Sequence, residues 1–168
     1  MQQESWVVPG KGFSDRISGK LLTHCFIMMF FGFVGGFVWL IALAGNVFHI
    51  VPLPRFEIIV PDQKELLRNV HVGTILNSMY VMAMVALSGR LNFSALQAKW
   101  VYYWAIVLLW GNMIGYSTAV YAPERGLQPI GEWPNLVSYG TFYIAVVAAT
   151  ITTGICLYSA IRAGRGRG

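Results

Sequence analysis

Two short stretches of the chain place polar side chains inside long apolar surroundings. In residues 68–77, His71 is followed six positions later by Asn77, and in residues 110–116, Asn112 precedes Tyr116 by four. Polar groups in membrane-spanning segments are functional candidates by default, because leaving them unpaired in lipid is costly. A neutral imidazole is suited to ligating a metal ion or haem iron. These four side chains are therefore the first candidates for a site.

Each histidine also has a structural interpretation. At the end of an apolar segment, His71 can simply bond to water or to a backbone carbonyl, although Gly73 leaves room nearby for a flat ring. His49 lies at the outer end of the first apolar segment and is a competing ligand. His24 lies near the opposite end of that segment, far in depth from His71. An axial pair of His24 and His71 is therefore not expected.

The other three polar residues can equally link helices by hydrogen bonds, which are common in membrane bundles. What favours a site is that Asn77, Asn112 and Tyr116 share a similar depth with His71. Asn112 and Tyr116 lie on one helix face because they are four residues apart. His71 and Asn77 point about 120° apart at 100° per residue, so one helix directs them into two different crevices.

The elements that must hold these residues are helices in a membrane. The chain of 168 residues is 56% hydrophobic and 11% charged, whereas soluble domains carry about 25% charged residues. Four apolar runs, over residues 19–47, 70–87, 98–121 and 136–161, can each cross a hydrocarbon core, which takes roughly 20 helical residues. The sequence therefore predicts an all-α, integral membrane four-helix bundle, with residues 1–168 as one transmembrane domain.

The segments around these runs contain their own signals. Ser14 and Asp15 indicate a helix start, where a short polar side chain takes up free backbone N–H groups. The connection over residues 48–69 is long, and its segment 56–60 is either a short strand or lies on the membrane surface. Prolines keep the outer connections from continuing as helix: Pro52, Pro54 and Pro61 in the first, and Pro123, Pro129 and Pro134 in the last.

The net charge of +5 does not indicate a nucleic-acid partner, because the basic residues are scattered through loops and tails and form no stripe. They follow the positive-inside rule instead. Both termini are predicted to be cytoplasmic, since the end of the bundle that holds them carries most of the basic residues: Lys11, Arg16, Lys20, Arg90, Lys99, Arg162, Arg165 and Arg167.

The sequence contains no Gly-rich phosphate loop, no catalytic triad and no carboxylate inside an apolar run. The missing carboxylates weaken a proton-coupled transporter interpretation, because such transporters often use them. Cys25 and Cys156 fall inside apolar runs, where free cysteines usually behave as small hydrophobic residues.

The two polar stretches resemble the styrene oxide isomerases, small four-helix membrane enzymes of bacterial styrene degradation. The resemblance is carried by His71, Val72, Gly73, Leu76 and Asn77, and by an ungapped block that contains Trp110, Asn112, Tyr116, Pro123, Arg125, Gly126 and Leu127. Thr74 stands where that family usually has a proline, and Arg68 lies one residue further from the histidine than in the family.

The resemblance implies an isomerase of the bacterial cytoplasmic membrane that converts an aryl epoxide such as styrene oxide to phenylacetaldehyde. It implies a homotrimer with haem b near the subunit contacts, with His71 as axial ligand and ferric iron as Lewis acid. Tyr116 would then orient the epoxide, while Asn112 and Asn77 bond the substrate oxygen or hold Tyr116 in place. Arg125 is expected at the outer surface, where it can pair with haem propionates.

Two interpretations from other classes stay open. In the first, the chain is a non-catalytic b-type haem subunit for electron transfer or sensing. This interpretation requires a second axial ligand beside His71, for which His49 is the candidate. In the second, the chain is a structural membrane subunit without a cofactor. A visible spectrum distinguishes these cases, because an open haem site gives high-spin ferric iron and two histidines give low-spin iron.

Overall fold

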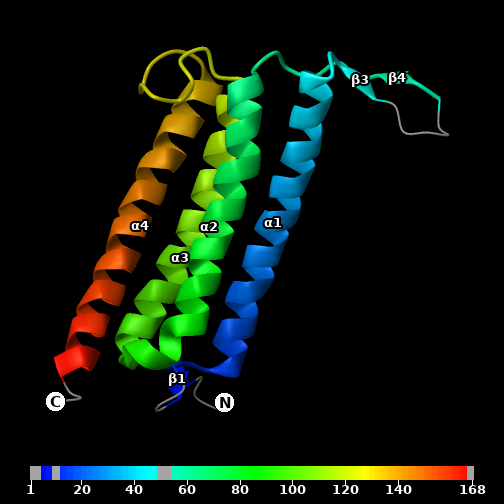
Figure 1. Cartoon of the computed structure of the whole chain (residues 1–168). Helices are drawn as coiled ribbons and strands as arrows, with labels where there is room; N and C mark the ends of the chain where they lie inside the picture. Colours follow the sequence, from blue (N-terminus) through cyan, green and yellow to red (C-terminus); the bar gives the residue numbers. More distant parts are fainter. Residues whose placement is uncertain (1–4, 9–11, 49–53, 166–168) are drawn as a thin grey trace.

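The computed structural model describes residues 5–8, 12–48 and 54–165, and the structural statements below refer to these. Four long helices lie side by side and alternate in direction (Figure 1). They are α1 (Asp15–Leu43), α2 (Lys64–Leu91), α3 (Ala95–Ala119) and α4 (Trp133–Arg165). The first turn of α1 and the last turn of α4 lie at the same end of the bundle, called here the terminal end. The predicted all-α four-helix fold is confirmed.

Two short antiparallel strand pairs flank α1. Strand β1 (Val7–Val8) pairs with β2 (Gly12–Phe13) at the terminal end, and β3 (Val47–Phe48) pairs with β4 (Phe56–Glu57) at the opposite, outer end. The segment 56–60 therefore begins as a short strand, one of the two predicted alternatives. His49 lies outside the described residues.

Helix α1 begins where predicted but ends earlier. Ser14 is its N-cap residue by position, although the Ser14 hydroxyl makes no capping bond. The helix ends at Leu43, not near Val47, because Gly45 and Asn46 adopt left-handed conformations with φ of 75° and 65°. A left-handed residue reverses the direction of the chain, which is how many helices end.

Helix α2 begins at Lys64, six residues before the apolar run that predicted it. Its first turns carry exposed charged residues, so an apolar window does not include them. From the apolar run, His71 was expected at the start of this helix. In the structure it lies about two turns inside the helix. The helix continues unbroken through Thr74, where the resembling family usually has a proline.

Helices α1, α2 and α4 are each long and apolar enough to cross a membrane, so the chain is a membrane protein. Helix α3 has a comparable 25 residues but is rich in Trp and Tyr, whose rings are less apolar than aliphatic side chains. Its start is fixed by a capping box: Ser94 Oγ accepts the Gln97 N–H at 3.2 Å, and Gln97 Oε1 accepts the Ser94 N–H at 2.9 Å.

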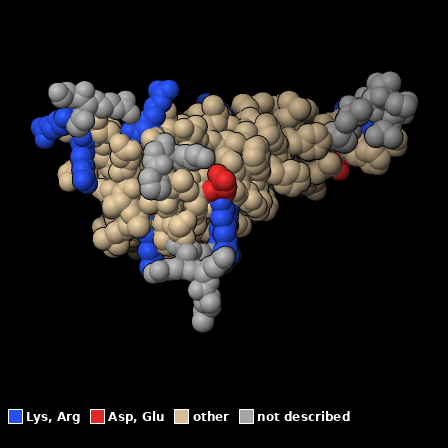
Figure 2. Space-filling view, turned by 90° about the horizontal axis from the view of Figure 1, so that it is seen from below, with Lys and Arg blue, Asp and Glu red and all other residues tan. Residues whose placement is uncertain are grey.

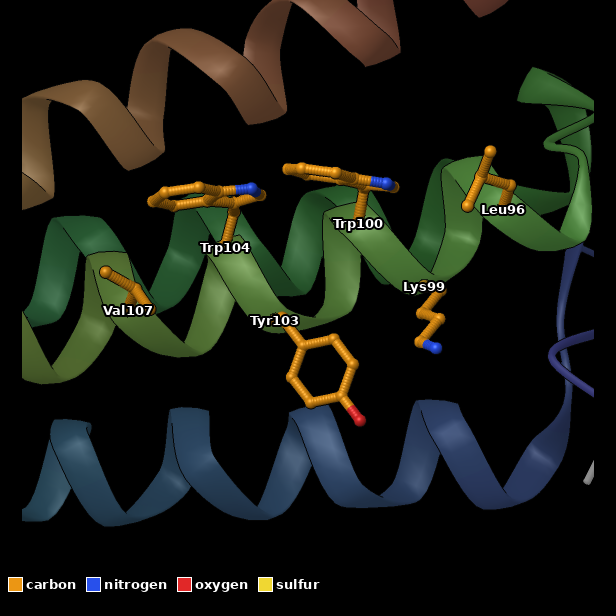
Figure 3. A pocket seen from close by; sticks show the side chains of 6 residues that line it. All are labelled: Leu96, Lys99, Trp100, Tyr103, Trp104 and Val107. Carbon is orange, nitrogen blue, oxygen red and sulfur yellow. The ribbon is translucent and has the colours of Figure 1, made fainter.

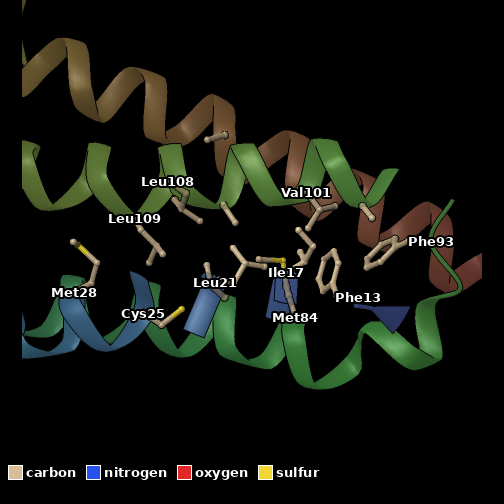
Figure 4. Close-up of a cluster of buried hydrophobic side chains, with 14 of the residues drawn as sticks. Phe13, Ile17, Leu21, Cys25, Met28, Met84, Phe93, Val101, Leu108 and Leu109 are labelled. Atoms are coloured by element: carbon tan, nitrogen blue, oxygen red, sulfur yellow. The ribbon is translucent and has the colours of Figure 1, made fainter. Parts of the chain in front are cut away.

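Two apolar clusters hold the bundle together. The larger fills its terminal half (Figure 4) and includes Ile17, Leu21, Met28, Val101 and Leu109. The smaller lies toward the outer end and consists of Ala42, Leu66, Leu67, Ala119 and Val120. Cys25 is fully buried in the larger cluster and both cysteines are free, in agreement with the prediction. His71, Asn77, Asn112 and Tyr116 lie between the two clusters, and Arg125 lies beyond the smaller one at the outer end.

Candidate functional site

His71 lies on the face of α2 that packs against α1. Its Nδ1 is 2.9 Å from the carbonyl oxygen of Gly32. A carbonyl oxygen only accepts, so Nδ1 carries the hydrogen and donates it. In the neutral ring, Nε2 then keeps a lone pair, and it has no hydrogen-bonding partner among the described residues. An imidazole oriented in this way is ready to ligate a metal through Nε2.

Small residues on α1 make room for this ring. A Cβ added at Gly36 would collide with the imidazole of His71, and one at Gly32 would lie 3.3 Å from the His71 carbonyl oxygen. The rings of Trp39 and Phe33 lie 6.2 and 6.5 Å from the imidazole, measured between centroids. His71 is therefore half-buried between a glycine-lined helix surface and aromatic rings.

Tyr116, a residue of α3, packs against the other side of α2. Its ring packs over Gly73, where an added Cβ would lie 2.6 Å from Tyr116 Cζ. The edge of the ring contacts Phe142 of α4, with ring centroids 5.1 Å apart. Gly73 follows His71 by two residues, a rotation of about 200° around α2 at 100° per residue, so the two lie on nearly opposite sides of this helix. Within one chain, His71 and Tyr116 therefore face different crevices.

Asn77 and Asn112 continue the Tyr116 side of the bundle. Asn77 lies one turn beyond Gly73 on α2, and Asn112 lies one turn before Tyr116 on α3. Because the two helices run in opposite directions, these amides are at the same level, one turn below the Gly73–Tyr116 contact. Both are half-buried, and neither makes a hydrogen bond within the described part of the chain. Their donors and acceptors are thus free for a ligand.

A pocket of about 350 Å³ opens above this layer toward the outer end of the bundle. Its lining comes from α2, α3, α4 and the connection before α4: Glu65, Leu66, Asn69, Tyr116, Ala119, Arg125, Leu127 and Phe142. Asn69 was not predicted, although its spacing of four from Gly73 and eight from Asn77 places all three on one face of α2. The pocket therefore adds a third amide beside Tyr116.

Arg125 lies at the mouth of this pocket. It is exposed at the outer end of the bundle, where the sequence predicted it. Its Nη1 is 3.7 Å from Glu65 Oε2, and both side chains are mostly exposed, so this ion pair contributes little to stability. Arg125 shares the Tyr116 pocket and not the His71 crevice.

Asn135, a second residue that sequence reasoning missed, holds the connection that carries Arg125. Its fully buried side chain accepts the Gly126 N–H at 2.8 Å and donates to the carbonyls of Gln128 and Ile130, each at 2.6 Å. These bonds fix the left-handed turn at Arg125 and Gly126, where φ is 55° and 68°. A polar residue after Trp133 and Pro134 resembles an ordinary helix start, so the sequence did not indicate this role.

The other described histidine, His24, has a structural partner. Its Nδ1 accepts a hydrogen bond from Trp110 Nε1 at 3.3 Å. Among the described residues, no three His, Cys, Asp or Glu side chains gather as a metal site. A metal bound through His71 would thus take its other ligands from elsewhere, as haem iron takes four from its porphyrin.

A family model described as styrene oxide isomerase matches residues 17–161. The matched region contains all five candidate residues, His71, Asn77, Asn112, Tyr116 and Arg125. Comparison with curated proteins gave no significant match.

Proposed function

Because the chain belongs to the styrene oxide isomerase family, we propose that it isomerises an aryl epoxide, such as styrene oxide, to the aldehyde phenylacetaldehyde. The observation that carries this proposal is the family match over residues 17–161, which includes most of the chain. The family implies isomerase activity in general. The particular substrate and the residue roles are inferred from the site.

His71 fits the requirements of a haem axial ligand. The Gly32 carbonyl holds the Nδ1 hydrogen, Nε2 is free, and the flanking rings of Phe33 and Trp39 suit a flat apolar group. Haem b bound there would supply a ferric Lewis acid for the epoxide oxygen. The exposed Arg125 would pair with its propionates.

The chain's own polar groups would orient the epoxide and stabilise charge. The Tyr116 hydroxyl donates to the epoxide oxygen, and the Asn77 and Asn112 amides donate to the same oxygen or hold the phenol. As the benzylic C–O bond breaks, a hydride moves with its electron pair from the neighbouring carbon to the benzylic carbon, and the carbonyl forms. No proton enters or leaves, so the rearrangement needs no carboxylate base in the spans.

Water must be kept from the cationic carbon during this shift, because its attack would give a diol. Phe142 and the buried Leu66 line the Tyr116 pocket with apolar surface and would exclude water from the reacting atoms. An aromatic substrate ring would also pack well on these side chains. The apolar part of the pocket therefore supports an aryl epoxide over a small hydrophilic one.

The opposite orientations of His71 and Tyr116 support a site shared between subunits. We propose a homotrimer in which one subunit contributes His71 and its neighbour contributes Tyr116, Asn112 and Asn77. In this arrangement Arg125 also reaches the shared site from the subunit that contributes Tyr116. The bundle would lie in a bacterial cytoplasmic membrane with both termini in the cytoplasm.

The test compares visible spectra of detergent-purified wild-type protein, His71→Ala and the matched control His24→Ala, with and without styrene oxide. We expect a Soret band in wild type and His24→Ala that shifts with epoxide, together with phenylacetaldehyde. His71→Ala should lose the band and the product, because it lacks the free Nε2. A Soret band that ignores the epoxide, without aldehyde, would instead indicate an electron-transfer subunit. No band in the wild type would exclude haem ligation by His71.

A further inference from the structure

A groove of about 430 Å³ lies on the surface of α3, away from the candidate site. It is lined by Leu96, Lys99, Trp100, Tyr103, Trp104 and Val107. Figure 3 shows the indole rings of Trp100 and Trp104 along one edge of the helix and Lys99 and Tyr103 along the other. From Leu96 to Val107 the groove is about 16 Å long at 1.5 Å per residue. Asn112 and Tyr116 lie beyond its inner end.

The aromatic walls of this groove are already ordered. The rings of Trp100 and Trp104 are stacked, with centroids 6.2 Å apart and planes inclined by 17°. Tyr103 contacts the rings of Trp6 at 5.9 Å and Tyr102 at 5.1 Å. A preformed apolar channel binds a flexible chain without first having to order its own side chains.

Lys99 gives the groove one charged end. It lies in the first turns of α3, and its ammonium group makes no ion pair or hydrogen bond within the described part of the chain. Figure 3 shows the Tyr103 hydroxyl on the same edge of the helix. The groove therefore combines a cation and a phenol near the membrane boundary with an apolar channel that runs inward. A ligand that fits has an anionic head and a long apolar tail.

The charge of the terminal end favours a lipid, and not a second copy of this chain, as the occupant of the groove. Figure 2 shows that Lys and Arg dominate this end. Asp15 is the one acidic residue described there, against Arg16, Lys20, Arg90, Lys99, Arg162 and Arg165. A second copy docked at the same level would bring mostly like charge to Lys99, whereas an anionic lipid brings the opposite charge.

We propose that this groove binds an anionic phospholipid, with its phosphate on Lys99 and Tyr103 and one acyl chain along Trp100, Trp104 and Val107. Juxtamembrane basic residues attract anionic headgroups, and Trp and Tyr favour the membrane interface. The proposal is independent of the isomerase reaction, because no groove residue belongs to the candidate site.

Quenching of tryptophan fluorescence tests the proposal. The full-length protein is reconstituted in phosphatidylcholine vesicles, and phosphatidylglycerol with brominated acyl chains is added in increasing mole fraction. Each sample is compared with the same lipid without bromine, so quenching by other groups cancels. We expect saturable quenching at low mole fraction, which brominated phosphatidylcholine does not reproduce. Trp100→Phe combined with Trp104→Phe should remove this component while keeping an apolar wall.

The headgroup contact is tested with Lys99→Ala and the matched control Lys64→Ala at the outer end of α2. Lys99→Ala should raise the half-saturating mole fraction about fivefold, the effect of one basic residue near an anionic surface. Lys64→Ala and Lys99→Arg should leave it near the wild-type value. Equal quenching by both headgroups, or no effect of Lys99→Ala, would overturn the proposal. No quenching of Trp100 and Trp104 would overturn it too, because another subunit would then cover the groove.

Discussion

The two described histidines show how one hydrogen bond decides what an imidazole can do. At His71, Nδ1 donates to the Gly32 carbonyl, which leaves the Nε2 lone pair free. At His24, Nδ1 instead accepts from Trp110 Nε1, so in the neutral ring the hydrogen is on Nε2 and the lone pair is occupied. His71 is therefore prepared to ligate, whereas His24 links two helices. Side-chain type alone did not separate these roles.

At the scale of single residues, Gly36→Ala should weaken haem binding although it leaves His71, the proposed axial ligand, in the sequence. The added methyl group would collide with the His71 ring and break its bond to the Gly32 carbonyl. Loss of such an orienting contact lowers the affinity for the metal group by about 10- to 100-fold. The measurement is haem titration followed at the Soret band. Gly19→Ala on the same helix is the control, because nothing lies within 4 Å of its new Cβ. Wild-type affinity in Gly36→Ala would contradict this role.

At the scale of elements, the connection before α4 matters because it positions one wall of the Tyr116 pocket. Its shape depends on the Asn135 side chain, which bonds to three backbone groups of the connection. Ser138, one turn further along α4, donates to the Gly115 carbonyl at 2.9 Å and so ties α4 to α3 beside Tyr116. The connection and the α3–α4 pair thus form one structural unit around the pocket.

Asn135→Ala should therefore lower both stability and isomerase activity. It leaves the buried Gly126 N–H unpaired, at a cost of about 1–3 kcal/mol, and removes two further bonds to the partly buried carbonyls of Gln128 and Ile130. Thermal unfolding in detergent, followed by circular dichroism, measures the first effect, and aldehyde formation measures the second. Gln128→Ala is the matched control in the same connection, because it keeps the carbonyl that Asn135 bonds. If Asn135→Ala unfolds at the wild-type temperature, these bonds do not hold the connection.

The sequence predicted the number, order and approximate positions of the helices, because a long apolar segment in a membrane must satisfy its own backbone hydrogen bonds as a helix. The predicted end of α1 and the predicted start of α2 were wrong. The charged first turns of α2 are helical but not apolar, so His71 lies deeper in its helix than expected. Helical periodicity predicted that His71 and Asn77 point in different directions, and the contacts of His71 with Gly32 and of Gly73 with Tyr116 lie on different sides of α2. The partners of Asn135 could not be predicted, because they are backbone groups of an irregular connection.

At the scale of the whole molecule, the candidate site residues of one chain face two different sides of α2. His71 faces α1, while Tyr116, Arg125 and the pocket lie among α2, α3 and α4. A head-to-tail ring of subunits brings unlike faces together at every contact. The proposed trimer would therefore repeat one complete site at each of its subunit contacts.

Mixed trimers of His71→Ala and Asn77→Ala chains test this arrangement. In any ring that contains both variants, one contact joins an intact His71 to an intact Asn77, so we expect about one third of wild-type activity. The two variants are co-expressed with different affinity tags, purified through both tags and assayed for aldehyde. Trimers of a single variant, which have no intact contact, are the control. Mixed trimers as inactive as these would contradict a shared site.

The acceptor that orients His71 is a main-chain oxygen, and this affects how the protein tolerates mutation. No side-chain replacement at position 32 can delete that carbonyl. Substitutions at Gly32 and Gly36 act through bulk alone, since an added Cβ meets Ile75 or the His71 ring. Across related sequences, the orientation of the imidazole would then be protected by a limit on residue size at two helix positions, with no requirement for any polar residue there.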